Sequence, residues 1–118
     1  MLKIMIVDDA QFLRLRIANL LAKQGYQILE AEDGEQAVET YRLAHPDAVF
    51  MDITMPRKDG LSALAEIRKL DPRAKVIMLS ALGQQSMIVE AMKAGASDFL
   101  VKPYKSEQIM KVLQKALA

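Results

Sequence analysis

Hydrophobic residues along this chain form short continuous runs, separated by longer stretches in which they recur every three or four positions. Continuous apolar runs of this length are typical of strands covered on both faces, as in a parallel sheet between two layers of helices. Four strong runs and one weaker run fit this description, at residues 4–7, 48–51, 76–79 and 99–101 and, more weakly, at 28–29. The pattern predicts five parallel strands, with the weaker run at an edge of the sheet.

The stretches between these runs predict helices. Leu13, Ile17 and Leu21 follow the helical period in the first stretch, as Ile109 and Leu113 do in the last. Three polar residues are suitable N-caps, namely Asp9, Asp33 and Ser106. Strands and helices alternate without a long linker or repeat. We therefore expect a single α/β domain over residues 1–118, with five helices and a flavodoxin-like doubly wound sheet in the strand order 2-1-3-4-5.

Composition and charge narrow the functional classes. Hydrophobic residues make up 52% of the chain, and 16 Lys and Arg nearly balance 15 Asp and Glu, which leaves a formal net charge of +1. No global field favours nucleic acid or an anionic membrane. No apolar stretch approaches the roughly 20 residues of a membrane span, and the chain lacks cysteine, which excludes disulfides and thiolate sites. We expect a cytoplasmic protein that binds neither a membrane nor nucleic acid.

Polar side chains follow four of the predicted strands. Asp8 and Asp9 come after the first run, Asp52 after the third, Ser80 after the fourth and Lys102 after the fifth. The carboxyl ends of parallel strands face one crevice, and ligands bind where the strand order reverses. We therefore expect the three carboxylates to meet between the first and third strands.

Three neighbouring carboxylates repel one another, so this cluster predicts a divalent cation. Mg²⁺ prefers oxygen ligands and often uses one or two carboxylates together with a substrate phosphate. Lys102 adds an ammonium group for the same phosphate, and Ser80 adds a hydroxyl donor. Taken alone, an acidic pair more often caps a helix, and a lysine or serine more often lies in solvent. The joint pattern indicates a Mg²⁺-dependent phosphate site.

These motifs resemble the receiver domain of bacterial two-component response regulators, and the resemblance spans the whole chain. They are an acidic pair at 8–9, the sequence MDITMP at 51–56, SA at 80–81 and VKP at 101–103. The segments at 51–56 and 80–85 are also similar to single-domain chemotaxis regulators of the CheY type. The resemblance implies a phosphorylation-dependent switch rather than an enzyme, with self-catalysed phosphorylation and dephosphorylation.

The resemblance also implies a role for each matching residue. Asp52 accepts the phosphoryl group from the phosphohistidine of a sensor kinase, and Lys102 pairs with the phosphoryl oxygens. The implied Mg²⁺ ligands are Asp9, Asp52 and the backbone carbonyl of Thr54, with Asp8 acting through a water molecule. Such catalysis depends mainly on positioning and on neutralising the phosphoryl oxygens. Carboxylates are ionised at neutral pH, so the acceptor needs no separate base.

The switch implied by the resemblance begins at Ser80, which turns to donate a hydrogen bond to the new phosphate. Phe99, on the last strand, then rotates inward. The Lys102–Pro103 peptide bond is expected to be cis, an isomer essentially confined to proline. Phosphorylation adds about −1.5 to −2 charge, enough to shift the populations of a two-state loop and helix.

The expected partners are a sensor histidine kinase of the chemotaxis type and a downstream protein, with the flagellar motor switch as a candidate. The kinase docks at the first helix in this family, although Arg14 and Arg16 most simply cover the exposed side of that helix. The fourth predicted helix carries apolar side chains over more of its circumference than one buried stripe needs. We expect a monomer with a partner-binding face formed by Ile88, Phe99 and Tyr104.

Two positions near the acceptor predict a long phosphate lifetime. Thr54 lies two residues after Asp52, where many family members have Asn, and Leu82 lies two residues after Ser80, where polar residues are common. A short Thr54 and an apolar Leu82 would orient the hydrolytic water poorly. The hypothesis predicts that Leu82→Glu changes the dephosphorylation rate.

Alternative functions remain open within and outside the family. The chain could be a phosphorelay intermediate or another stand-alone response regulator, whereas its length disfavours a DNA-binding regulator. An aspartyl-phosphate phosphohydrolase of the haloacid dehalogenase type would need an acid where Thr54 stands. A flavodoxin-like FMN carrier conflicts with the acidic loops, and neither Gly-rich nucleotide-binding pattern is present. A structural adaptor would not be phosphorylated by acetyl phosphate.

Overall fold

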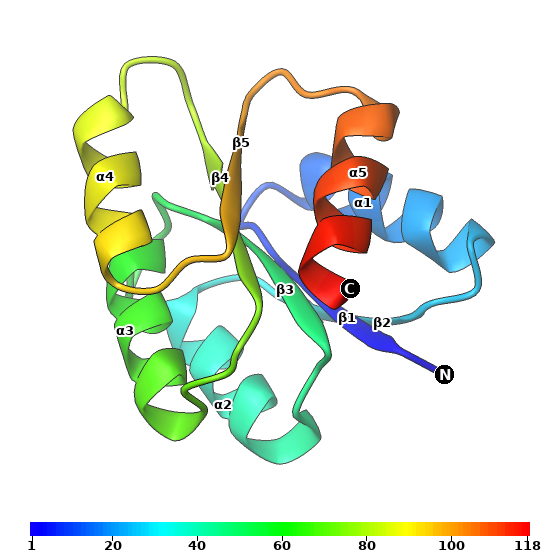
Figure 1. Cartoon of the computed structure of the whole chain (residues 1–118), viewed down its shortest axis with the longest axis horizontal. Coiled ribbons are helices and arrows are strands. Elements are labelled where there is room, and N and C mark those ends of the chain that lie inside the picture. Colours follow the sequence, from blue (N-terminus) through cyan, green and yellow to red (C-terminus); the bar gives the residue numbers. More distant parts are fainter.

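Five strands and five helices alternate along the chain in the computed structural model, which describes residues 1–118 (Figure 1). The strands are β1 (Lys3–Val7), β2 (Gln27–Ala31), β3 (Ala48–Asp52), β4 (Val76–Ser80) and β5 (Asp98–Val101). The helices are α1 (Gln11–Lys23), α2 (Gly34–Ala44), α3 (Gly60–Leu70), α4 (Gln85–Lys93) and α5 (Ser106–Leu117). None of these helices combines the length and the apolar character needed to cross a membrane.

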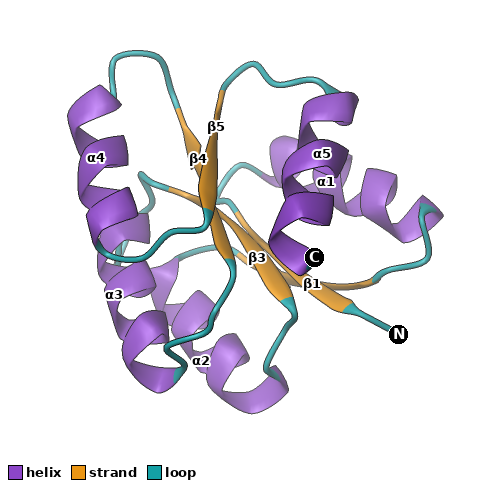
Figure 2. Ribbon diagram, in the orientation of Figure 1, coloured by secondary structure: helices purple, strands orange, loops and turns teal.

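The sheet is parallel throughout and has the strand order β2-β1-β3-β4-β5, which confirms the predicted topology. Helices α1 and α5 cover one face, and α2, α3 and α4 cover the other (Figure 2). The chain moves outward from β1 to β2 and then returns across β1 to β3. The strand order therefore reverses between β1 and β3, where a ligand site is expected in an open α/β sheet.

Two hydrophobic cores, one on each face of the sheet, explain the continuous apolar runs. Along β1, Met5 and Val7 belong to the core under α2, α3 and α4, while Ile4 and Ile6 belong to the core under α1 and α5. Because successive side chains of a strand point to opposite faces, a strand covered on both sides needs apolar residues at every position. The edge strand β2 is less buried, and only Ala31 is fully enclosed.

The helix starts differ in part from the sequence prediction. Asp33 is confirmed as an N-cap, since its side chain accepts a hydrogen bond from the backbone N–H of Gln36 at the start of α2. The predictions for Asp9 and Ser106 were wrong, because α1 starts one residue later and α5 one residue earlier, so that Ser106 is already helical. An unpredicted cap is Asp59, which accepts from the N–H of Ser62 in α3.

The prediction that Arg14 covers the exposed side of α1 was also wrong. Its side chain is buried against β2, where Nε donates to Glu30 Oε1 at 2.9 Å and Nη1 donates to the backbone carbonyl of Asp8 at 2.8 Å. Arg16 lies exposed, as predicted. A buried guanidinium needs acceptors for its donors, and the edge strand and the loop after β1 supply them.

Candidate functional site

Three carboxylates meet at the carboxyl ends of β1 and β3. One carboxylate oxygen each from Asp8, Asp9 and Asp52 lies within 4.8 Å of the other two. Asp8 and Asp52 are buried, whereas Asp9 is exposed to solvent. The structure therefore brings together the acids that the sequence predicted to converge, and leaves one side of the cluster open.

The backbone at the end of β3 leaves no space for a side chain at Gly60. The N–H of Gly60 donates to the carbonyl of Ile53 at 2.7 Å, and a Cβ on Gly60 would lie 2.0 Å from the backbone oxygen of Asp52. Only glycine allows so close an approach. The first residue of α3 is thus packed directly against the residue at the end of β3.

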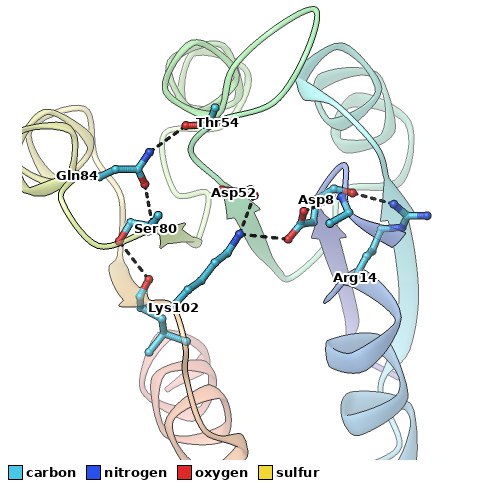
Figure 3. Close-up of polar contacts among 10 residues, drawn as sticks. Asp8, Arg14, Asp52, Thr54, Ser80, Gln84 and Lys102 are labelled. Atoms are coloured by element: carbon cyan, nitrogen blue, oxygen red, sulfur yellow. Dashed lines mark hydrogen bonds and ion pairs between the residues drawn. The ribbon is translucent and has the colours of Figure 1, made fainter. Parts of the chain in front are cut away.

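Lys102 connects the fifth strand to the acidic cluster (Figure 3). Its Nζ lies 2.9 Å from Asp52 Oδ2 and 3.7 Å from Asp8 Oδ2. The Lys102–Pro103 peptide bond is cis, as predicted. Burial lowers the pKa of the Lys102 ammonium, but the hydrogen bond to Asp52 and the charges of both carboxylates outweigh this effect, so the pKa lies above its ordinary value. Lys102 is therefore a fixed positive charge beside Asp52.

Asp8 carries the clearest sign of a cation site. Its Oδ1 accepts from the backbone N–H of Ala10 at 2.9 Å, but its Oδ2 is buried without a hydrogen-bond partner. Burial raises the pKa of the Asp8 carboxyl, and the Asp52 carboxylate raises it further. Lys102 Nζ, at 3.7 Å, is too far from this oxygen for a hydrogen bond, and a buried carboxylate oxygen without a hydrogen bond is costly unless a cation binds it more closely. The cluster of hard oxygen donors fits Mg²⁺.

Ser80 and Phe99, the predicted switch residues, have contrasting positions. Ser80 is fully buried at the end of β4, and its Oγ donates to the backbone carbonyl of Leu100 at 3.3 Å. Phe99, on β5, is 38% exposed. The hydroxyl is therefore engaged across the strands while the aromatic ring lies at the surface.

The predicted partner face differs from the arrangement in the structure. Tyr104 is only 6% exposed and packs in the core under α1 and α5, and Ile88 is half-buried against the opposite core. Burial raises the pKa of Tyr104 to about 12, with Asp8 and Asp52 acting in the same direction. Of the three predicted residues, only Phe99 lies exposed. Further exposed apolar side chains belong to α4, namely Met87, Val89 and Met92.

A residue that the sequence reasoning did not single out, Gln84, lies beside the site (Figure 3). Its Nε2 donates to the hydroxyl of Thr54 at 2.9 Å, and its Oε1 accepts from the backbone N–H of Ala81 at 2.6 Å. Thr54 follows β3 and Ala81 follows β4. A long polar side chain in the loop after β4 was the available signal, but no pattern in the sequence indicates that it turns back toward β3.

Comparisons with known proteins agree with this geometry. Residues 4–114 match the family model described as the response regulator receiver domain. The chain is 50% identical to the chemotaxis protein CheY of Bacillus subtilis over 98% of its length and 97% of that protein, and 48% identical to CheY of Thermotoga maritima over 96% and 95%. Its structure is similar to the crystal structure of a CheX–CheY–BeF3–Mg²⁺ complex from Borrelia burgdorferi, with a TM-score of 0.93, 33% identity and coverage of 99% and 90%.

Proposed function

Because the chain belongs to the response regulator receiver domain family, and is therefore a phosphorylation-dependent switch of a two-component system, we propose that Asp52 is its phospho-acceptor. The observation that supports this assignment is the contact of 2.9 Å between Lys102 Nζ and Asp52 Oδ2, beside the carboxylates of Asp8 and Asp9. We also propose that residues 1–118 act as one receiver domain.

In the proposed reaction, a carboxylate oxygen of Asp52 attacks the phosphorus of a kinase phosphohistidine in line with the bond to the imidazole. The P–N bond breaks, its electron pair stays on the imidazole nitrogen, and a P–O bond to the carboxylate forms. Lys102 neutralises charge on the phosphoryl oxygens, which is the main form of catalysis in such transfers. Its contact with Asp52 holds the ammonium there before the phosphate arrives.

The proposed Mg²⁺ ligands are Asp8, Asp9, Asp52 and the carbonyl of Thr54. Asp8 supplies the buried oxygen that lacks a hydrogen-bond partner, and exposed Asp9 lies on the open side of the cluster. When bound, Mg²⁺ would supply charge neutralisation between the carboxylates and the phosphoryl oxygens. Arg14 holds the Asp8 carbonyl and thereby the position of the acidic loop.

The acceptor is tested by intact mass after incubation with acetyl phosphate and Mg²⁺. We expect the parent protein to gain one phosphate and Asp52→Asn to gain none. The matched control is Asp98→Asn, because Asp98 begins β5 at the opposite end of the sheet and should not affect the reaction. A phosphate on Asp52→Asn would assign the acceptor to another residue, and loss of phosphorylation in Asp98→Asn would show that the effect is not specific.

We propose that Ser80 and Phe99 transmit the phosphorylated state. Ser80 would leave the Leu100 carbonyl to bind a phosphoryl oxygen, and the exposed ring of Phe99 would turn inward. The chain has no tryptophan, so Phe99→Trp places one fluorophore at the proposed switch. Its emission should change on addition of acetyl phosphate and Mg²⁺, and should not change when Asp52→Asn or Ser80→Ala is added. An unchanged emission in the single variant would contradict the proposal.

The groove beside Lys102 is the proposed docking place for the phosphohistidine donor. Its volume is about 320 Å³, and it is lined by Leu13, Arg16, Lys102, Pro103 and Tyr104. It lies between the start of α1 and the loop after β5, and one of its lining residues contacts the acceptor directly. A kinase domain bound here would bring its histidine to the open side of the acidic cluster.

We propose chemotaxis as the pathway, because the Bacillus subtilis and Thermotoga maritima relatives bear that name, and the cytoplasm as the location. The exposed apolar residues of α4 and β5 would bind the downstream protein. The chain should restore chemotaxis to a Bacillus subtilis strain that lacks its own CheY. Val89→Asp should lose this activity, and Leu43→Asp, at an exposed apolar position on α2, should keep it. Equal rescue by both variants would move the target face away from α4.

A further inference from the structure

The side chain of Gln84 connects two loops that border the acidic cluster. Its amide donates to Thr54 Oγ1, in the loop after β3, and accepts from the Ala81 N–H, in the loop after β4. The two contacts are 2.9 and 2.6 Å long. In Figure 3 the Gln84 amide lies between the labelled Thr54 and Ser80. The nitrogen of this one amide contacts the loop after β3, and its oxygen contacts the loop after β4.

The position of Gln84 in the chain leaves its side chain available for these two contacts. It is the N-cap residue of α4, yet its side chain makes no capping hydrogen bond. The N-cap residues of α2 and α3, Asp33 and Asp59, both use their side chains to cap their own helices. A short polar side chain such as Asp at this position satisfies a free N–H of the first turn, whereas the N-cap residue of α1, Ala10, makes no such bond. At Gln84 the side chain instead turns away from α4 and toward the phospho-acceptor.

We propose that Gln84 is a positioning residue that holds these two loops together beside the phospho-acceptor and so lengthens the lifetime of the aspartyl phosphate. This inference rests on the proposed phosphorylation of Asp52. In hydrolysis, water attacks phosphorus, the P–O bond to the Asp52 carboxylate breaks, and inorganic phosphate leaves. The water must approach from the solvent side, where the exposed residue Thr54 lies. The Gln84 bridge restricts that approach by fixing the Thr54 side chain and the backbone at Ala81.

The first test measures the loss of phosphate in Gln84→Met, which keeps the length of the side chain and removes both hydrogen bonds. We expect the half-life of the aspartyl phosphate to fall about threefold, the effect of one hydrogen bond of modest net strength. The matched control is Gln85→Met, at the adjacent and exposed glutamine, which should keep the parent half-life. An unchanged half-life in Gln84→Met, or an equal fall in both variants, would overturn the proposal.

A double-mutant cycle separates the bridge from a general effect on α4. Thr54→Val removes the hydroxyl that Gln84 contacts at nearly constant volume. If the two residues act through one bridge, the double variant Gln84→Met/Thr54→Val should lose phosphate no faster than the faster single variant. Effects that multiply would show that the two side chains act independently, and would overturn the proposal.

A second measurement uses the unphosphorylated protein. The Ala81 amide should exchange with solvent about threefold faster in Gln84→Met, because it loses its acceptor, and at the parent rate in Gln85→Met. An unchanged Ala81 amide in Gln84→Met would mean that the bridge does not form in solution. If this amide responds but Asp52 is not phosphorylated by acetyl phosphate, the bridge exists and the proposed function fails instead.

Discussion

Helices α3 and α4 are neighbours on one face of the sheet, but they are attached to it very differently. In α3 the side chain of Asp59 caps the first turn, and the buried residues are Gly60, Ala63, Leu64 and Ile67. In α4 no side chain caps the first turn, and Ala91 is the one fully buried residue. Met87, Val89 and Met92 of α4 are exposed. We therefore expect α4 to be displaced from the sheet more easily than α3.

The difference matters because α3 follows β3, which ends at the proposed phospho-acceptor Asp52, and α4 follows the neighbouring strand β4. The start of α3 contacts the backbone of Asp52 through Gly60, and its end is held by the hydrogen bond from Tyr41 to Asp71. The start of α4 is connected to the site by the side chain of Gln84. Elements with few buried apolar contacts respond first to a local change. If Asp52 is the acceptor, as proposed, we expect α3 to hold it in place and α4 to move on phosphorylation.

The largest expected effect comes from Gly60→Ala, which disturbs the close contact between the start of α3 and the end of β3. A Cβ would lie 2.0 Å from the Asp52 backbone oxygen, so the backbone of β3 or α3 must shift. We expect the free energy of unfolding in urea to fall by at least about 3 kcal/mol. Gly83→Ala, in the loop before α4, is the control. Gly83 has φ +88° with no atom within 4 Å of an added Cβ, so it should cost only about 1 kcal/mol. Equal costs would contradict the comparison.

The next effect tests the unequal burial of the two helices. Leu64→Ala, at a fully buried position of α3, should lower the free energy of unfolding by about 3 kcal/mol, because it removes buried methyl groups and leaves a cavity. Met92→Ala, on α4 at 42% exposure, should cost less than about 1 kcal/mol. Urea unfolding of both variants measures the difference. A loss at Met92 as large as that at Leu64 would show that α4 is as firmly packed as α3.

A smaller, pH-dependent effect tests the contact that holds the end of α3. Tyr41 Oη donates to Asp71 Oδ2 at 2.7 Å, and this bond lowers the pKa of Asp71 below its ordinary value. A carboxyl whose pKa is lower in the folded state stabilises the fold above its unfolded pKa, and loses that contribution as the pH falls through the folded value. Tyr41→Phe should therefore cost about 1 kcal/mol at neutral pH and progressively less below about pH 4. A cost that does not change with pH would contradict the assignment.

The smallest expected effect concerns the solvent side of the loop before α4. Leu82 is 78% exposed, and a carboxylate there could accept a hydrogen bond from the hydrolytic water. Leu82→Glu should shorten the life of the aspartyl phosphate about threefold, far less than a well-positioned general base provides, because the side chain is not held in place. The control is Leu43→Glu, on α2 at 74% exposure. An unchanged rate in Leu82→Glu would refute the hypothesis that Leu82 prolongs the phosphate lifetime.

Much of the candidate site could be predicted from the sequence, because its carboxylates lie at the ends of predicted strands. A residue that ends a buried parallel strand or directly follows it lies at a predictable edge of the sheet. Asp52 ends β3, and Asp8 and Lys102 directly follow β1 and β5. The burial of Tyr104 could not be predicted in this way. It lies two residues after Lys102, and its orientation depends on the core formed by α1 and α5.

Arg14 and Gln84 show the same limit for long polar side chains. The helical period places Arg14 on α1, but its burial depends on Glu30 of the edge strand and on the Asp8 carbonyl. Likewise Gln84 finds its partners in two loops that are 30 and 3 residues away along the chain. Flexible polar side chains take the direction in which unsatisfied groups are available, and a periodic pattern does not contain this information.

The order of apolar runs determined the fold by itself, since strands enclosed on both faces have few alternatives to a parallel sheet between helices. It also indicated that the acidic residues and the lysine lie at one edge of the sheet, because they end or follow parallel strands. Only the tertiary structure decided which helix is fixed and which is loosely packed. That distinction depends on burial and close backbone contacts between distant segments, such as the one between Gly60 and Asp52, and the responsive part of the switch is therefore a property of packing.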